Sequence, residues 1–176
     1  MMKKLRIGLV VLLFLVFAGK IGAQHYEVGR IDLQRAAPRG DDSWITDLEV
    51  SGFRPGASVL PHNTTCDQYG RFLFWLPSGE WKVSVKSQHS LGTIRPIQGR
   101  VSGDTGFGLL LEGDANNDNV IDDLDFAILT DVYWTDSPLA DFNQDGQVNA
   151  LDFSLLNSNY GRKGPICYTY LAQVSK

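Results

Sequence analysis

The chain has 176 residues and a formal net charge of −4, from 16 Lys and Arg against 20 Asp and Glu. The first 23 residues hold four of the basic side chains and none of the acidic ones, so the remainder carries a net charge of −8. This acidic balance disfavours binding to nucleic acid, whose phosphates would be repelled. The length allows one or two small domains.

Residues 1–23 have the pattern of an export signal. A basic start is followed by an apolar stretch over residues 7–19 and by a small-residue cleavage site before Gln24. The apolar stretch is short for crossing a bilayer. We therefore predict a secreted protein, extracellular or at the cell surface, with no membrane association after cleavage. An uncleaved membrane anchor is the alternative.

Residues 25–111 have the pattern of short β-strands punctuated by Gly and Pro. Residues 71–76 form a continuous apolar run, which is typical of a strand buried on both faces. In residues 81–86 apolar side chains alternate with Lys82, Ser84 and Lys86, which predicts a strand with one wet face. Other candidate strands are residues 26–33, 44–50, 94–101 and 106–111. The pattern predicts a mainly β fold, a small Greek-key β-sandwich.

Two stretches of this region resemble a known family of sandwiches. Residues 64–72, with Asp67 and Gly70, and residues 76–83, which begin Leu-Pro-Ser-Gly, are similar to the carboxypeptidase-regulatory-like, transthyretin-related domains, together with residues 29–34 before them. Asp67 and Gly70 are suited to a tight turn. The resemblance implies a binding or spacer module that brings no catalytic residues.

The sequence contains no pattern typical of an enzyme. His-Glu-x-x-His, Gly-x-Ser-x-Gly and phosphate-loop motifs are absent, and the three histidines are scattered along the chain. We therefore expect no catalytic activity. Trp44, Trp75 and Trp81 would offer a sugar-stacking surface if exposed, but their apolar neighbours favour burial in the core.

Two twelve-residue stretches follow, which we call loop 1 (residues 114–125) and loop 2 (residues 141–152). Each places carboxylate or amide oxygens at its first, third, fifth, ninth and twelfth places, with a main-chain carbonyl at the seventh. This spacing wraps oxygen around one hard divalent cation and predicts two bound Ca²⁺ ions. The predicted ligands are Asp114, Asn116, Asp118, Val120, Asp122 and Asp125 in loop 1, and Asp141, Asn143, Asp145, Gln147, Asn149 and Asp152 in loop 2.

The charge distribution agrees with metal binding. Residues 112–161 carry eleven acidic side chains and no Lys or Arg. Such a cluster repels itself, and bound cations would offset the repulsion and contribute to folding. A solvated acidic face is the simpler interpretation, but the repeated spacing favours calcium.

A short helix is predicted after each loop. After loop 1, one helical face carries Leu124, Ile128, Leu129 and Val132. In the second unit, Leu151, Leu155 and Leu156 share a face in the same way. Eight of twenty paired positions are identical between the two units, which indicates a duplication. We expect the two apolar stripes to pack against each other, because neither helix is long enough to be stable alone.

This duplicated unit has Asp rather than Glu at the twelfth place and no helix before either loop. It resembles a type I dockerin module over residues 112–161, followed by a tail at residues 162–176. The resemblance implies an EF-hand-like, calcium-folded module that binds a cohesin-type partner and attaches secreted proteins to a scaffold. Because dockerins commonly accompany polysaccharide-degrading enzymes, it also implies a link to polysaccharide catabolism.

Two features depart from the family pattern. Asn119 stands at the sixth place of loop 1, where Gly is usual, and Asn tolerates the left-handed backbone required there. Leu124 and Leu151 stand at the eleventh places, where the familiar recognition residues carry hydroxyl groups. They are either contacts for a more apolar partner or part of the core.

The sequence leaves alternatives open. The short junction at residues 112–113 allows the calcium repeat to be a structural terminus packed on its own sandwich. The sandwich is alternatively a carbohydrate-binding accessory module. Cys66 and Cys167 either form a disulfide, which export would permit, or remain two thiols.

Overall fold

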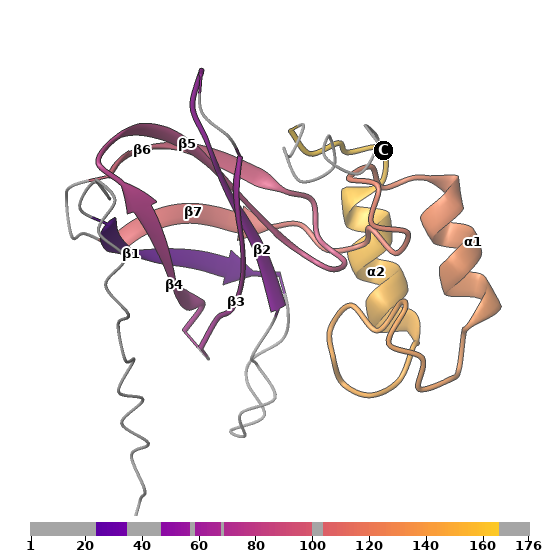
Figure 1. Ribbon diagram of the computed structural model, residues 1–176. Coiled ribbons are helices and arrows are strands. Elements are labelled where there is room, and N and C mark those ends of the chain that lie inside the picture. The colour runs from indigo at the N-terminus through magenta and orange to yellow at the C-terminus, as the bar shows by residue number, and fades with distance from the viewer. Residues whose placement is uncertain (1–23, 35–46, 57–58, 68, 100–103, 166–176) are drawn as a thin grey trace, which may run out of the picture.

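The structure, a computed structural model, describes residues 24–34, 47–56, 59–67, 69–99 and 104–165 (Figure 1). Within these ranges a β region precedes a small helical region, in the order predicted. The strands are β1 (Gln24–Leu33), β2 (Asp47–Phe53), β3 (Leu60–Thr65), β4 (Arg71–Pro77), β5 (Gly79–Ser87), β6 (Thr93–Gly99) and β7 (Asp104–Leu110), and the helices are α1 (Asp123–Asp131) and α2 (Ala150–Asn159).

The strands form two sheets, with the orders β4-β1-β7 and β3-β2-β5-β6. Strands β1 and β7 pair in parallel, and the other neighbours pair antiparallel. Buried side chains from both sheets join in one core, so the predicted β-sandwich is confirmed. Its buried members are Ile31, Leu48, Val50, Cys66, Phe72, Phe74, Leu76, Trp81, Val83, Val85, Ile97, Phe107 and Leu110.

A tight turn leads into β4, as Asp67 and Gly70 predict. The Asp67 carboxylate accepts hydrogen bonds from the backbone N–H groups of Tyr69 and Arg71, at 2.8 and 2.9 Å. Gly70 has φ +71°, and a Cβ atom there would lie 2.0 Å from the carbonyl oxygen of Ile31. Glycine is therefore required where this turn passes under β1.

Two strand predictions are wrong in detail. Strand β4 is not buried on both faces: its side chains alternate, and Leu73 is exposed, because only the inner face packs on the second sheet. Strand β5 does not have one wet face, because Ser84 and Lys86 are buried. Ser84 lies between β2 and β6 in the middle of its sheet. Lys86 is covered by the helical region, with which it forms an ion pair.

Trp81 is buried in the sandwich core, as expected, whereas Trp75 is partly exposed. Trp44, Cys167 and the export signal of residues 1–23 lie outside the described residues. Cys66 is buried. No helix in the described part of the chain combines the length and apolar character needed to cross a membrane.

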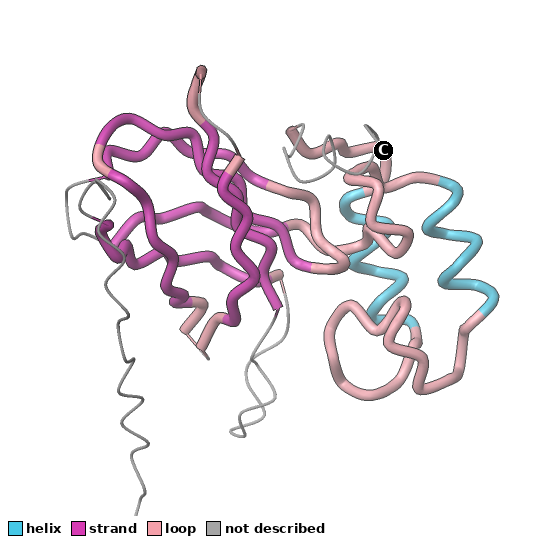
Figure 2. Tube along the Cα trace, in the orientation of Figure 1, coloured by secondary structure: helices cyan, strands magenta, loops and turns pink. Residues whose placement is uncertain are grey.

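The helices and the loops around them lie beside the sandwich (Figure 2). Their buried side chains form a second core. Leu129 and Leu156 are buried at its centre. Leu124 and Leu151, predicted on the same stripes, are 61% and 58% exposed. The prediction fails for these two because each buried face is centred on the twelfth-place carboxylate and the leucine four residues later. Each exposed leucine precedes that carboxylate by one residue, about 100° around the helix.

Candidate calcium loops

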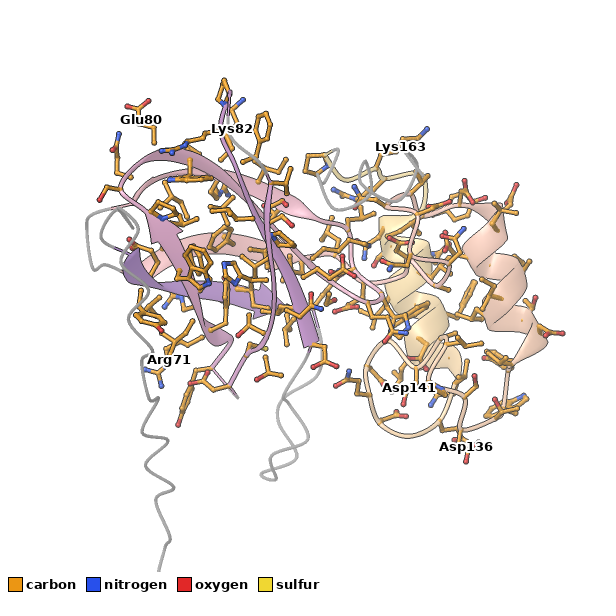
Figure 3. All side chains as sticks on the ribbon, viewed as in Figure 1. Arg71, Glu80, Lys82, Asp136, Asp141 and Lys163 are labelled. Carbon is orange, nitrogen blue, oxygen red and sulfur yellow. The ribbon has the colours of Figure 1, made fainter. Side chains whose placement is uncertain are left out.

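The carboxylate at the first place closes each loop. The Asp114 side chain is buried, and its Oδ1 and Oδ2 accept hydrogen bonds from the backbone N–H groups of the fifth and sixth places, at 3.0 and 2.8 Å. Asp141, labelled in Figure 3, accepts the same two bonds at 3.1 and 2.9 Å. The first-place residue therefore sets the curvature of both loops in the same way.

The carboxylate at the twelfth place joins each loop to its helix. Asp125 and Asp152 are buried, and each accepts a hydrogen bond from the third-place backbone N–H, at 3.1 and 3.0 Å. Each also accepts one from the ninth-place N–H, at 2.8 and 2.9 Å. The ninth residue, Asp122 or Asn149, is the N-cap of the following helix, so this second bond is half of a capping box.

The third and fifth places also match between the loops. Asn116 accepts a hydrogen bond from the backbone N–H of Asp118 at 2.9 Å, and its amide donates to the Asp118 carboxylate at 3.0 Å. Asn143 and Asp145 repeat both bonds at the same distances. The side chains at the third and fifth places thus converge in each loop.

The backbone is left-handed at the fourth and sixth places of both loops. The φ angles are 62° and 69° at Asn117 and Asn119, and 55° and 89° at Gln144 and Gly146. Asn is among the non-glycine residues that best tolerate this conformation. Asn119 therefore supports the turn that the loop needs, as predicted from its type.

The seventh and ninth places have additional roles. The seventh-place residues Val120 and Gln147 would each contribute a main-chain carbonyl, and that of Gln147 accepts a hydrogen bond from the Asn149 amide at 3.0 Å. The ninth-place side chains of Asp122 and Asn149 cap α1 and α2 through the backbone N–H two residues on, at 2.9 and 2.8 Å. The ninth place thus serves the helix cap as well as the predicted ligand set.

The loops concentrate negative charge away from water. Burial raises the pKa of Asp114, Asp125 and Asp152, and nearby loop carboxylates add to the rise. Backbone hydrogen bonds oppose the rise in all three, and at Asp114 the Lys86 ammonium opposes it as well. A divalent cation would favour the ionised forms. Buried acidic oxygens that already converge in a loop therefore fit a bound cation.

The donor types fit calcium. No group of three or more His, Cys, Asp and Glu side chains in the described residues is arranged to hold a metal by itself. The loops instead combine carboxylates with Asn amides and main-chain carbonyls. An all-oxygen set of this mixed kind, in a flexible loop, is what Ca²⁺ takes.

Loop 1 has a partner that sequence reasoning missed. The Lys86 ammonium on β5 lies 2.5 Å from Oδ2 of Asp114, and the two side chains are 7% and 0% exposed. Lys86 also donates to the carbonyl of Ser90, and the backbone N–H of Asp114 donates to the carbonyl of His89 at 3.0 Å. The turn after β5 therefore packs directly against the start of loop 1.

Asn119 connects three segments. Its side-chain Oδ1 accepts a hydrogen bond from the backbone N–H of Gly92 at 2.7 Å, and its Nδ2 donates to the carbonyl of Pro165 at 2.5 Å. Its own carbonyl accepts from the backbone N–H of Gly164 at 2.9 Å. A Cβ atom at Gly164 would lie 2.2 Å from Asn119 Oδ1. Glycine at the sixth place would forgo the two side-chain bonds, which gives a reason for Asn here.

A further set of hydrogen bonds ties α2 to the sandwich. The Asn159 amide donates to the side-chain oxygen of Gln34 at 2.6 Å and to the carbonyl of Glu112 at 2.7 Å. The backbone N–H of Glu112 donates to the same Gln34 oxygen at 3.2 Å. Leu91, from the turn after β5, is part of the helical core. The helical region is therefore packed on the sandwich.

The helices also present apolar side chains to solvent. Leu124 and Leu151 are the most exposed of these, and Phe126 and Phe153 are each 40% exposed. The two phenylalanine rings contact each other, with centroids 6.1 Å apart. Because these four residues occupy equivalent places in the duplication, α1 and α2 display matching apolar groups.

The fold and the site together define a β-sandwich joined to a duplicated, calcium-type loop-and-helix module. Residues 112–160 match the family model described as the dockerin type I domain. This segment is a type I dockerin module, as the loop pattern and the missing first helices predicted. Such a module is a non-catalytic interaction module.

Comparison with solved structures shows the same fold. One similar chain belongs to an N-terminal interface mutant of a type II cohesin–X-dockerin complex from Acetivibrio cellulolyticus, at 17% identity and a TM-score of 0.57, covering 80% of this chain and 97% of that one. A C-terminal interface mutant of the complex gives 16% identity and a TM-score of 0.56 with the same coverage. Comparison with curated proteins gives no match.

Proposed function

We propose that this protein is a secreted attachment protein. Its dockerin module, residues 112–161, binds two Ca²⁺ ions through the twelve predicted ligands and presents α1 and α2 to a cohesin-type partner, while residues 25–111 form the sandwich that is thereby attached. The exposure of Leu124 and Leu151 carries the partner part of this proposal. The similar chains from cohesin–X-dockerin complexes support it.

Calcium binding is supported by the agreement between two independent loops. Both fold their first- and twelfth-place carboxylates inward on the same backbone N–H groups. Eleven acidic side chains and no Lys or Arg lie in residues 112–161, and the structure brings Lys86 to a carboxylate of loop 1. Bound calcium would offset this charge and stabilise the folded module by linkage.

Partner binding is supported by the chemistry of the helix surface. Leu124 and Leu151 stand where familiar recognition pairs carry hydroxyl groups, and both project into solvent. Exposed apolar groups that recur at equivalent places on neighbouring helices are typical of an interaction surface. We therefore propose a cohesin-type partner whose contact surface is apolar where it meets these leucines.

Isothermal titration of the calcium-loaded protein with a panel of cohesin domains tests this proposal. Replacing either leucine with Lys, in L124K and L151K, should weaken binding at least about tenfold, which corresponds to about 1.4 kcal/mol. The matched control is L109K, because Leu109 is a comparably exposed leucine on β7, at 49%. Equal affinities for all three variants, or no binding by any cohesin, would contradict the proposal.

A structural role for the module is a second candidate, favoured by the hydrogen bonds of Gln34, Glu112 and Asn159. In that role the module is a terminus that stabilises its own sandwich. Deletion of residues 112–176 tests it: the sandwich should lose stability or unfold. The two roles are compatible, since one side of the module meets the sandwich and another exposes the leucines. If the isolated sandwich melts at the same temperature as it does in the full chain, the structural role is contradicted and the attachment role is not affected.

We also propose a link to polysaccharide catabolism, on the strength of the dockerin resemblance.

Trp81 is buried and cannot stack on a sugar. The partly exposed Trp75 pairs across the strands with Tyr26, which is 60% exposed, so these two would form the sugar-contacting surface of a carbohydrate-binding sandwich. Quenching of Trp fluorescence by a glycan panel tests this, with Y26A as the comparison. A flat response across the panel would count against it.

A further inference from the structure

The ion pair between Lys86 and Asp114 joins a strand of the sandwich to a predicted calcium ligand. Both side chains are almost fully buried, at 7% and 0% exposure. Oδ2 of Asp114, the oxygen that Lys86 contacts, also accepts the backbone hydrogen bond that curves loop 1 at its sixth place. The contact therefore acts on the oxygen that shapes the loop.

The charges of the two loops explain why a cation at this place matters. Loop 1 has aspartate at its first, fifth, ninth and twelfth places, whereas loop 2 has aspartate at three of these and Asn149 at the ninth. With Lys86 included, the net charge at the predicted ligand places of loop 1 equals that of loop 2. Loop 1 also has Asp123 at its tenth place, but this side chain is exposed and accepts a hydrogen bond from the Tyr160 hydroxyl.

We propose that Lys86 is a built-in counter-cation of loop 1. It offsets the additional carboxylate of that loop and stabilises the loop before calcium binds, so loop 1 depends less on calcium for its fold than it would without the lysine. Lys86 is a positioning residue rather than a ligand, because it acts through Asp114. The inference rests on the proposed calcium binding and assigns a sandwich residue to the control of that site.

The direction of the effect follows from Coulomb's law. Without calcium, removal of the ammonium leaves Asp114 buried without its opposite charge and beside the other carboxylates of the loop. With calcium bound, the ion supplies the positive charge that Asp114 has lost in the variant. The ion is also no longer repelled by the Lys86 ammonium. Loss of Lys86 should therefore destabilise the calcium-free protein more than the calcium-loaded protein and increase the response to calcium.

Thermal unfolding of the full chain, in chelator and in calcium, tests the proposal. In chelator, K86M should melt several degrees below the wild type, and its melting temperature should rise more than that of the wild type on adding calcium. K86R keeps the charge and should behave as the wild type. K82M is the matched control, because Lys82 is exposed on the same strand, away from the helices (Figure 3), and it should change neither value.

A compensating variant separates charge from packing. Asp122→Asn gives loop 1 the residue that loop 2 has at its ninth place, where Asn caps the helix equally well. The double variant K86M/D122N should therefore recover a large part of the melting temperature lost by K86M in chelator. If K86M loses the same amount with and without calcium, and the double variant recovers nothing, Lys86 is a packing residue and the proposal is overturned.

The test also distinguishes this inference from calcium binding itself. A wild-type chain that melts identically in calcium and in chelator would refute the proposed calcium function. A wild-type chain that responds, together with a K86M variant that responds to the same extent, would refute only the role of Lys86. If K86M does not fold in either buffer, the double variant K86M/D122N decides: it should fold and respond to calcium, and its failure to fold overturns the proposal.

Discussion

Loop 1 and loop 2 have nearly the same internal structure, but the sandwich contacts loop 1 through an ion pair and hydrogen bonds, and loop 2 through the rings of His89 and Phe142. Their first- and twelfth-place carboxylates accept the same backbone hydrogen bonds, at distances that agree within about 0.1 Å. Loop 1 is held by Lys86, by the turn after β5 and by the segment at Gly164 and Pro165. The comparison shows that a local pattern can fix the shape of a loop while distant segments add contacts to one copy of it.

The largest expected difference between the loops is at their twelfth places. D152A removes a buried carboxylate that accepts two backbone hydrogen bonds, and should cost about 3 kcal/mol in calcium. D125A removes the same bonds from a loop that the sandwich also holds, so it should cost less. Chemical denaturation of both variants measures the difference. A larger loss for D125A than for D152A would break the comparison.

The sixth places give a smaller contrast. N119G introduces the residue usual for the family but removes two side-chain hydrogen bonds, and should destabilise the protein by about 1–2 kcal/mol. The reciprocal change, G146N, places Asn at φ 89° with nothing near its Cβ, and should cost less than about 1 kcal/mol. Thermal unfolding in calcium compares them. An N119G variant as stable as the wild type would show that the Asn119 contacts contribute little.

The exposed leucines should have almost no effect on stability. Since L124K and L151K change side chains that are more than half exposed, each should alter the free energy of unfolding by no more than about 0.5 kcal/mol. Chemical denaturation of L124K, L151K and the wild type measures this difference. A loss above about 2 kcal/mol at either place would indicate that the leucine is part of the core, as in the alternative reading of the sequence.

The smallest effect concerns pH. Burial raises the pKa of Asp125 and Asp152 above 3.8, with nearby loop carboxylates adding to it. Without calcium, the folded loops therefore take up protons at a higher pH than the unfolded chain, so these groups favour folding increasingly as the pH falls from the raised pKa toward 3.8. With calcium, protons compete with the ion and the trend reverses. Melting temperatures in calcium and in chelator should thus converge on acidification.

Local spacing made the loops predictable. The inward first- and twelfth-place carboxylates and the left-handed sixth place follow from residues within one twelve-residue window, and the short helices follow from the spacing of apolar residues after it. That these places bind calcium stays a prediction. The burial of each helix was only partly predictable, because the inward direction is set by the twelfth-place carboxylate, which a count of apolar residues does not include. Leu124 and Leu151 were misplaced for this reason.

Contacts between distant segments were not predictable. Lys86 alternates with apolar residues in a strand and so has the pattern of a solvent-facing lysine, and nothing near it in the sequence indicates that Asp114 covers it. The bonds between Gln34 and Asn159 join residues 125 positions apart. Strand β3, which is Leu60–Thr65, was missed because its alternation of Pro, His, Asn and Thr lacks an apolar face.

The most direct test of the account is differential scanning calorimetry of the full chain with saturating calcium and with chelator. We expect calcium to raise the melting temperature of the helical module, and a titration to give two bound ions per chain. A melting profile unchanged by chelator, or a chain that binds no calcium, would contradict the claim that these loops fold around metal ions.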